Sequence, residues 1–189
     1  ERFTSLHGLY LGFLIFRGGT WYATFKTENT NWVSASEVMS YGAWQNLTIV
    51  YNGSELVFYH DTAQVGSHSV SGSFDDYDGD MILGLGATNW GNRYFSGNID
   101  EFRIWNIALS QSQIESYMTT PPIGNESGLV GYWDFNGGEG SSTVIDQTGN
   151  GNDGIINGGA TYSTDVPISG CTHPNATNYD ETANVDDGS

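Results

Sequence analysis

Alternation of apolar and polar residues along the chain predicts a series of short strands joined by tight turns. Residues 9–16 are apolar on both faces, which is typical of a central strand. Further strands are predicted at residues 20–27, 47–51, 55–60, 81–85 and 100–105. Asn52 and Gly53 begin a predicted hairpin turn, because both residue types tolerate positive φ. The pattern therefore predicts an all-β chain.

One short helix is predicted directly after the last of these strands. Ser110 is a good N-cap and Gln113 stands three residues later, which makes a capping box. Leu109 and Ile114 occupy the two positions of a hydrophobic staple. The prolines at 121–122 cannot continue a helix, so we expect it to end before them.

Two segments resemble parts of a known family. The strand and helix at 95–114 (FSGNIDEFRIWNIALSQSQI) are followed at 128–162 by an aromatic strand, a Gly-rich turn and an Asp with a Gly-Asn string. Together they resemble the laminin-G-like, concanavalin-A-like lectin and glucanase domains, over most of 9–166. The resemblance implies an antiparallel β-sandwich of the jelly-roll type. It also implies more strands ahead of Glu1, so we expect a piece of a longer protein.

Charge narrows the range of partners. The 189 residues include 22 acidic and five basic ones, and Arg103 is the last basic residue, followed by 11 acidic residues. Nucleic acid and anionic membranes are improbable partners, because both attract Lys and Arg. The acidic surplus favours either a well-solvated surface or carboxylates that hold calcium. No run approaches the roughly 20 apolar residues of a membrane span.

The composition changes near residue 168, which we predict to be a domain boundary. Residues 1–167 would form the sandwich, with 26 glycines and 26 aromatic residues in the whole chain to build its turns and core. Residues 168–189 resemble a short Asp/Asn-rich, Cys-containing repeat of Bacteroidetes surface proteins. Such repeats carry a second Cys, so Cys171 is expected to have its partner beyond Ser189, in a truncated repeat. The alternative is a flexible acidic spacer.

Calcium is the one cofactor that the chain suggests. The resemblance implies a structural calcium held by side chains of the strand before the helix and of the Asp/Asn-rich turn. The matching residues are Asp100, Asp134, Asp146, Asn152 and Asp153. In the acidic tail, the oxygen ligands would be Asn178, Asp180, Asp186 and Asp187. Ordinary turn chemistry is the alternative explanation for these Asp and Asn residues.

A sugar site is predicted in the loop at 87–95. Sugar recognition needs an aromatic face against the pyranose ring and polar side chains that reach its hydroxyls. The loop supplies Asn89, Trp90, Asn92, Arg93 and Tyr94, and Trp32 is a second aromatic candidate. Arg93 would suit an acidic or sulfated sugar. The alternative is that Trp90 and Tyr94 cover the edge of the core, as we expect of Trp105 and Trp133.

No catalytic motif is recognised. The carboxylate pattern E-x-D-x-x-E of sandwich-fold glycoside hydrolases does not occur. Asp100 and Glu101 are neighbours on a predicted strand and would point to opposite faces. The four histidines, at positions 7, 60, 68 and 173, have no metal-binding spacing, and Cys171 has no recognisable base beside it.

Two functions follow from these observations. The first is a non-catalytic module of a secreted or cell-surface bacterial protein that binds polysaccharide through the aromatic loop. The second is an adhesin or spacer module that contacts neighbouring domains or proteins and binds no sugar. Both place the chain outside the cell, an expectation that comes from the resemblance and the composition.

Overall fold

The computed structural model describes residues 11–17, 20–26, 33–38, 42–71, 85–86, 93–94 and 96–186. Side chains are described within 42–71, 96–168 and 170–185. The chain divides into two compact units, residues 1–97 and 98–189, and each is treated by itself. The predicted domain boundary at residue 167 is not tested by this division and stays a prediction.

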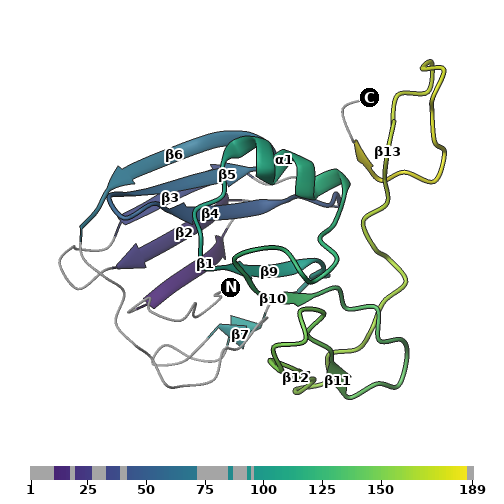
Figure 1. Ribbon diagram of the computed structural model, residues 1–189. Helices are drawn as coiled ribbons and strands as arrows, with labels where there is room; N and C mark the ends of the chain where they lie inside the picture. The colour runs from purple at the N-terminus through teal and green to yellow at the C-terminus, as the bar shows by residue number, and fades with distance from the viewer. Residues whose placement is uncertain are drawn as a thin grey trace. The chain divides into compact units, whose positions relative to one another are not determined.

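The described elements of unit 1 are strands (Figure 1). They are β1 (Leu11–Arg17), β2 (Thr20–Lys26), β3 (Val33–Val38), β4 (Leu47–Tyr51), β5 (Glu55–His60), β6 (Ala63–Ser69), β7 (Leu85–Gly86) and β8 (Arg93–Tyr94). The first three form one antiparallel sheet in the order β1-β2-β3, and the next three form another in the order β4-β5-β6. β7 pairs with β8, and β3 lies beside β6.

The β4–β5 hairpin confirms the two predicted strands, and Gly53 and Asn52 form its turn in different ways. Gly53 has a φ of +97°, which a residue with a side chain rarely adopts. Asn52 contributes in another way, because its Oδ1 accepts hydrogen bonds from the backbone N–H groups of Ser54 and Glu55 at 3.0 and 2.9 Å. Only one of the two expected residues therefore has positive φ. The hairpin places Phe58 in the core, with no exposed surface.

The described part of unit 2 holds the helix and six short strands that are joined by long turns (Figure 1). Its elements are β9 (Phe102–Trp105), α1 (Gln111–Thr119), β10 (Leu129–Trp133), β11 (Thr143–Val144), β12 (Gly154–Ile155), β13 (Ser169–Gly170) and β14 (Val185–Asp186). The pairs β9–β10 and β11–β12 are antiparallel, and β13–β14 is parallel. The structure thus confirms strands in mostly antiparallel sheets with one short helix, as in the predicted sandwich class.

The helix α1 begins as the sequence predicts. The N-cap Ser110 side chain accepts a hydrogen bond from the Gln113 backbone N–H, and the Gln113 side chain accepts one from the Ser110 N–H at 2.9 Å. This is the predicted capping box. Ile114 is buried, and the helix ends at Thr119, ahead of the two prolines. In the part of the chain that the structure describes, no helix is long and apolar enough to cross a bilayer.

The strand before the helix is shorter than predicted. β9 begins at Phe102, because Glu101 has a φ of +53°, outside the range of a strand. Trp133 is buried, and its ring lies 5.6 Å from that of Phe102. Trp105 stacks on Tyr117 at 5.0 Å. Both tryptophans thus pack within unit 2, as expected.

The C-terminal segment folds back on itself. The Ile168 backbone N–H donates to Oδ1 of Asn184 at 2.6 Å, and the Asn184 N–H donates to the Ile168 carbonyl at 2.9 Å. Cys171 is 2% exposed and pairs with Tyr179 through an isolated β-bridge. Apart from β13 and β14 the described part of this segment is irregular, as predicted.

Candidate functional site

Asp146 organises the turn between β11 and β12. Its side chain is only 4% exposed. Its Oδ1 accepts hydrogen bonds from the Tyr132 N–H at 3.2 Å and from the N–H and hydroxyl of Thr148 at 3.0 and 2.7 Å. Its Oδ2 accepts from the backbone N–H and side-chain amide of Asn152 at 3.2 and 2.9 Å. Five donors therefore converge on one carboxylate.

The same turn is fastened to β10 by further hydrogen bonds. The side-chain amides of Asn150 and Asn152 both donate to the Val130 carbonyl, at 3.0 and 3.1 Å. The indole N–H of Trp133 donates to the Asn152 carbonyl at 2.9 Å. Asp146 is thus the centre of a polar network that holds a Gly-rich segment of the chain against a strand.

The pKa of Asp146 lies below its usual value. Burial alone would raise the pKa, but hydrogen bonds from Thr148, Tyr132 and Asn152 to the charged form outweigh this effect. The carboxylate is therefore ionised at neutral pH, and its charge is balanced by donors of the turn.

This donor set does not fit calcium at Asp146. An ionised carboxylate has about four lone-pair sites, and five donors already occupy them. Asp153 Oδ1 likewise accepts the Asp146 N–H at 2.9 Å. Within the described ranges, no group of three or more His, Cys, Asp or Glu side chains is placed to hold a metal ion. Calcium binding elsewhere in the chain stays a prediction.

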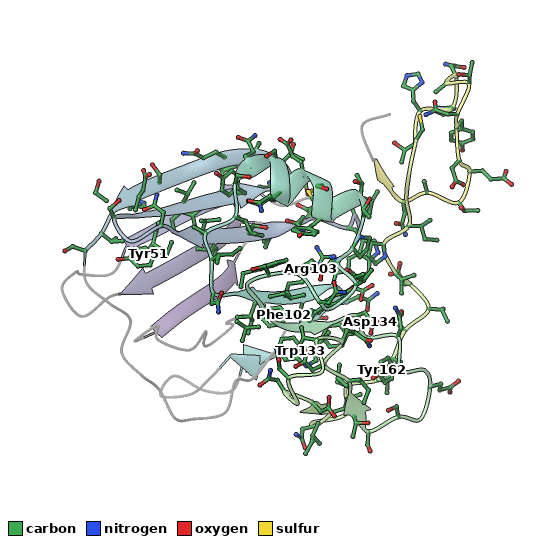
Figure 2. The ribbon with its side chains drawn as sticks, viewed as in Figure 1. Tyr51, Phe102, Arg103, Trp133, Asp134 and Tyr162 are labelled. Atoms are coloured by element: carbon green, nitrogen blue, oxygen red, sulfur yellow. The ribbon has the colours of Figure 1, made fainter. Side chains whose placement is uncertain are left out.

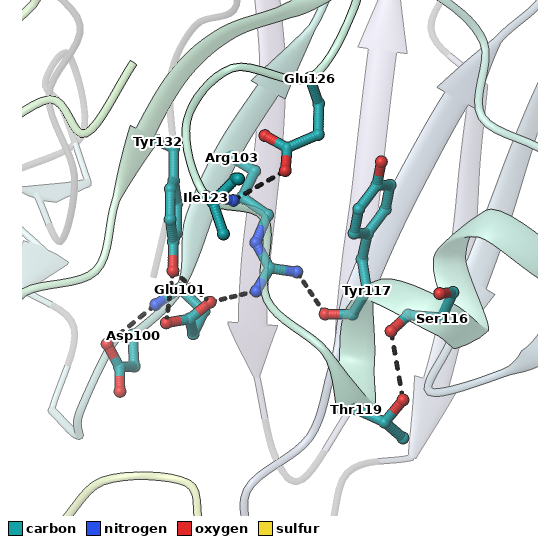
Figure 3. Close-up of polar contacts among 9 residues, drawn as sticks. All are labelled: Asp100, Glu101, Arg103, Ser116, Tyr117, Thr119, Ile123, Glu126 and Tyr132. Carbon is teal, nitrogen blue, oxygen red and sulfur yellow. Dashed lines mark hydrogen bonds and ion pairs between the residues drawn. The ribbon is translucent and has the colours of Figure 1, made fainter. Parts of the chain in front are cut away.

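A second polar network joins β9, α1 and β10 (Figure 3). The Tyr132 hydroxyl donates to Glu101, 2.9 Å from Oε1. Arg103 forms an ion pair with Glu101 and donates from Nη1 to the Tyr117 carbonyl at 2.8 Å, while its guanidinium lies 5.4 Å from the centre of the Tyr132 ring. The buried Nε of Arg103 has no hydrogen-bond partner in the part of the chain that the structure describes.

This network also contains an acid with an unusual pKa. Burial, with the nearby negative charges of Glu101 and Asp134, raises the pKa of Asp100 to about 6. Burial and the Glu101 carboxylate raise the pKa of Tyr132 well above its usual value, so its hydroxyl stays a donor. Residue patterns along the chain do not reveal this network, because Tyr132 is 31 positions from Glu101.

The described part of unit 2 also contains a small open pocket at the end of β10. Its volume is about 220 Å³. The pocket is lined by Asp134, Phe135, Asn136, Gly137, Val144, Ile145, Gln147 and Tyr162. Figure 2 shows Asp134 and Tyr162, which approach the pocket from segments far apart in the sequence. Of these residues, only Asp134 was a predicted site residue.

The walls of this pocket are held in place. The Tyr162 hydroxyl donates to the Thr143 carbonyl at 2.8 Å. A Cβ at Gly137 would lie 2.5 Å from that hydroxyl oxygen, so only glycine allows this approach. Asp134 Oδ1 accepts from the Asn136 N–H at 3.1 Å and from the Gln147 amide at 3.2 Å. Among the described residues, Asp134 Oδ2 has no hydrogen-bond donor.

The predicted sugar-binding loop is only partly described. Trp32, Asn89, Trp90 and Asn92 lie outside the described residues. The backbones of Arg93 and Tyr94 form β8 and pair with Gly86 and Leu85, but their side chains are not described. Whether the loop gathers its aromatic and polar side chains therefore stays a prediction.

Of the four predicted tail ligands, the structure describes the side chains of Asn178 and Asp180. Asp180 Oδ1 accepts from the backbone N–H and hydroxyl of Thr182, at 2.9 and 2.7 Å. Asn178 lies one residue before the bridge at Tyr179. Asp186 is described only as part of β14, and Asp187 lies outside the described residues. Calcium binding by this segment stays a prediction.

Comparison with known proteins identifies the family. A laminin-G-type family model, described as the concanavalin A-like lectin/glucanases superfamily, matches residues 3–115, more than half of the chain. No curated protein matches the chain.

Two solved structures are similar to it. The first, a candidate carbohydrate-binding protein from Bacteroides ovatus, is 16% identical with a TM-score of 0.64, over 86% of this chain and 50% of that one. The second, an S-layer domain-containing protein from Clostridium thermocellum, is 17% identical with a TM-score of 0.37, over 58% and 56% of the two chains. The chain thus matches about half the length of each of these structures. From the family match, the chain belongs to the concanavalin A-like lectin/glucanase superfamily.

Proposed function

We propose that this chain is a non-catalytic carbohydrate-binding module of a secreted or cell-surface bacterial protein. Its membership of the concanavalin A-like lectin/glucanase superfamily carries the proposal. The description of the Bacteroides ovatus protein agrees with it. The acidic composition and the Asp/Asn-rich tail are in keeping with a surface protein.

The loop at 87–95 is the proposed main contact with polysaccharide. It combines Trp90 and Tyr94, whose rings would lie against sugar rings, with two Asn side chains and one Arg that would bind hydroxyl or acidic groups. Trp32 is a second proposed aromatic contact.

Affinity electrophoresis of the full chain tests this proposal. The gels contain neutral, uronic or sulfated polysaccharides, in calcium and then in EDTA. We expect retardation by at least one class and a loss of about tenfold or more in affinity for Trp90→Ala, the usual effect of a central aromatic contact. Trp44→Ala is the matched control, because Trp44 lies outside the proposed loop.

The outcomes separate sugar binding from a structural role. The unfolding midpoints of both variants are measured alongside. If Trp90 merely covers the core, Trp90→Ala would lower the stability of the chain and leave its sugar affinity unchanged. A folded chain that no polysaccharide retards would contradict the proposal and favour an adhesin or spacer module. Loss of retardation in EDTA would link calcium to binding.

A further inference from the structure

We propose that the pocket at the end of β10 is a second sugar site, which takes a single uncharged pyranose residue of a glycan. This proposal rests on the proposed function, but it concerns other residues than the loop at 87–95. The pocket is formed wholly within unit 2, whereas the loop belongs to unit 1.

The size of the pocket suits one sugar ring. Its volume of about 220 Å³ is smaller than the roughly 300–1,000 Å³ of sites for drug-sized ligands. It is also open to solvent along the turn, since Asn136 and Gln147 are exposed. A terminal or branching residue of a glycan would therefore enter while the rest of the chain stays outside.

The walls supply the apolar contact that a pyranose needs. Phe135 and Tyr162 are half-buried aromatic residues of the lining, and Val144 forms a buried apolar part of it. The Tyr162 ring cannot turn freely, because its hydroxyl is bonded to the Thr143 carbonyl and packs against Gly137. A fixed ring costs little conformational entropy when a ligand binds.

Polar groups of the pocket are available to sugar hydroxyls. Asp134 Oδ2 accepts no hydrogen bond from the described residues, although Oδ1 accepts two. The Asn136 side-chain amide makes no hydrogen bond within the described chain, where only its backbone N–H is bonded. The carboxylate oxygen can accept a hydrogen bond from a sugar hydroxyl, and the amide can donate one to a neighbouring hydroxyl and accept another. The arrangement therefore supplies both kinds of contact that sugar recognition requires.

Charge selects the class of sugar. The lining contains the Asp134 carboxylate and no Lys or Arg. The whole chain carries no Lys or Arg after Arg103. A uronic or sulfated sugar would place a negative charge beside Asp134 with no cation to offset it, which is unfavourable. An uncharged sugar avoids this repulsion, so the pocket and the Arg93 loop would prefer different sugars.

The backbone of the pocket is strained as well. Phe135 has a φ of +49°, which is rare for a bulky residue. Such conformations cost free energy, and they cluster at active sites, ligand sites and switch regions, where the surrounding structure holds them. Here the strain belongs to a residue of the lining itself.

Saturation-transfer NMR on the full chain tests the site. The probes are glucose, galactose, mannose and xylose, with glucuronate and glucose 6-sulfate as charged counterparts. We expect saturation to be transferred from the protein to at least one neutral sugar, and not to the two charged sugars. Tyr162→Ala should weaken binding about tenfold or more, and Asp134→Asn and Asn136→Ala about threefold or more.

One pocket variant that should not disturb the fold, and one control outside both sites, keep the result interpretable. Asn136→Ala removes an exposed side chain with no described hydrogen bond of its own, so the fold should not change. Trp44→Ala, which lies outside both the loop and the pocket lining, should leave the retardation by polysaccharide and the monosaccharide signal intact.

Each other result has a separate meaning. A neutral-sugar signal that survives all three pocket variants, or a preference for the charged sugars, would overturn the pocket site. Retardation by polysaccharide without any monosaccharide signal would also overturn it, while the proposed function would stand. If neither assay shows binding by the folded chain, both proposals fail.

Discussion

Two aspartates of unit 2 have opposite surroundings. Asp146 is almost fully buried and receives five hydrogen bonds, so it has no capacity left for a ligand. Asp134 is half-buried and receives two, both on one oxygen. Twelve residues apart in one turn-rich segment, the first carboxylate holds the fold together and the second faces a pocket.

The comparison shows how to assign function among many acidic residues. A carboxylate whose lone pairs are all bonded within the chain serves structure, because any ligand must first displace those donors. A carboxylate with an open oxygen beside aromatic walls has a place for a ligand. Exposure and hydrogen bonding, rather than residue type, separate the two roles.

Removing the Asp146 carboxylate should have the largest effect. Asp146→Ala leaves the buried N–H of Tyr132 and the donors of Thr148 and Asn152 unsatisfied. We expect the free energy of unfolding to fall by about 3 kcal/mol. Asp134→Ala, the matched variant, should lower it by less than about 1 kcal/mol. Urea unfolding of both variants measures the difference, and equal losses would abolish the distinction between the two aspartates.

A methyl group at Gly137 should affect the pocket more than the fold. Gly137→Ala pushes the Tyr162 hydroxyl from its place. We expect a loss of about 1–2 kcal/mol in stability and a loss of monosaccharide binding. Gly138→Ala is the control, because it has φ of +80° and open space around its Cβ, so it adds strain without moving Tyr162. The prediction fails if the two variants bind sugar equally well.

A third carboxylate, Asp100, should make the protein less stable as the pH rises. Its pKa is about 6 in the folded chain against 3.8 ordinarily, so the folded state binds more protons between those values. The free energy of unfolding should therefore fall as pH rises from about 4 to 6. Asp100→Asn should be more stable than the wild type at pH 7.5, by about 1 kcal/mol after allowance for solvent screening. At pH 3.5 the two should be alike.

Asp146 should affect the pH dependence of stability in the opposite direction to Asp100, because its pKa is lowered and that of Asp100 is raised. The lowered pKa of Asp146 stabilises the folded state above the usual Asp pKa, and this stabilisation is lost as the pH falls through the folded-state pKa. Thermal unfolding from pH 3 to 8 separates the two slopes. A wild-type curve with the same slope as Asp100→Asn between pH 4 and 6 would contradict the assignment to Asp100.

Calcium should produce the smallest change. A cation needs open oxygens, which Asp134 has and Asp146 lacks. We expect millimolar Ca²⁺ to raise the unfolding midpoint of the chain by a few degrees at most. Calorimetry with and without EDTA measures it. An unchanged midpoint after complete chelation would remove the calcium prediction.

The sequence by itself determined the local elements. Ser110 and Gln113 set the start of α1, and the bounds of β4 and β5 agree with the predicted strands. These features depend on residues close together in the chain, where capping and alternation act directly. The predicted strand start at residue 100 was wrong, because the left-handed φ of Glu101 depends on its contacts with Tyr132 and Arg103, not on local propensity.

Only the tertiary structure decided what each acidic residue does. The resemblance to the family implied one calcium site that included both Asp134 and Asp146. Their different roles arise from distant partners, such as Tyr132 for Asp146, and Tyr162 as a wall of the pocket beside Asp134. Hydrogen-bond satisfaction and pocket shape are properties of packed segments, so residue type and spacing alone do not reveal them.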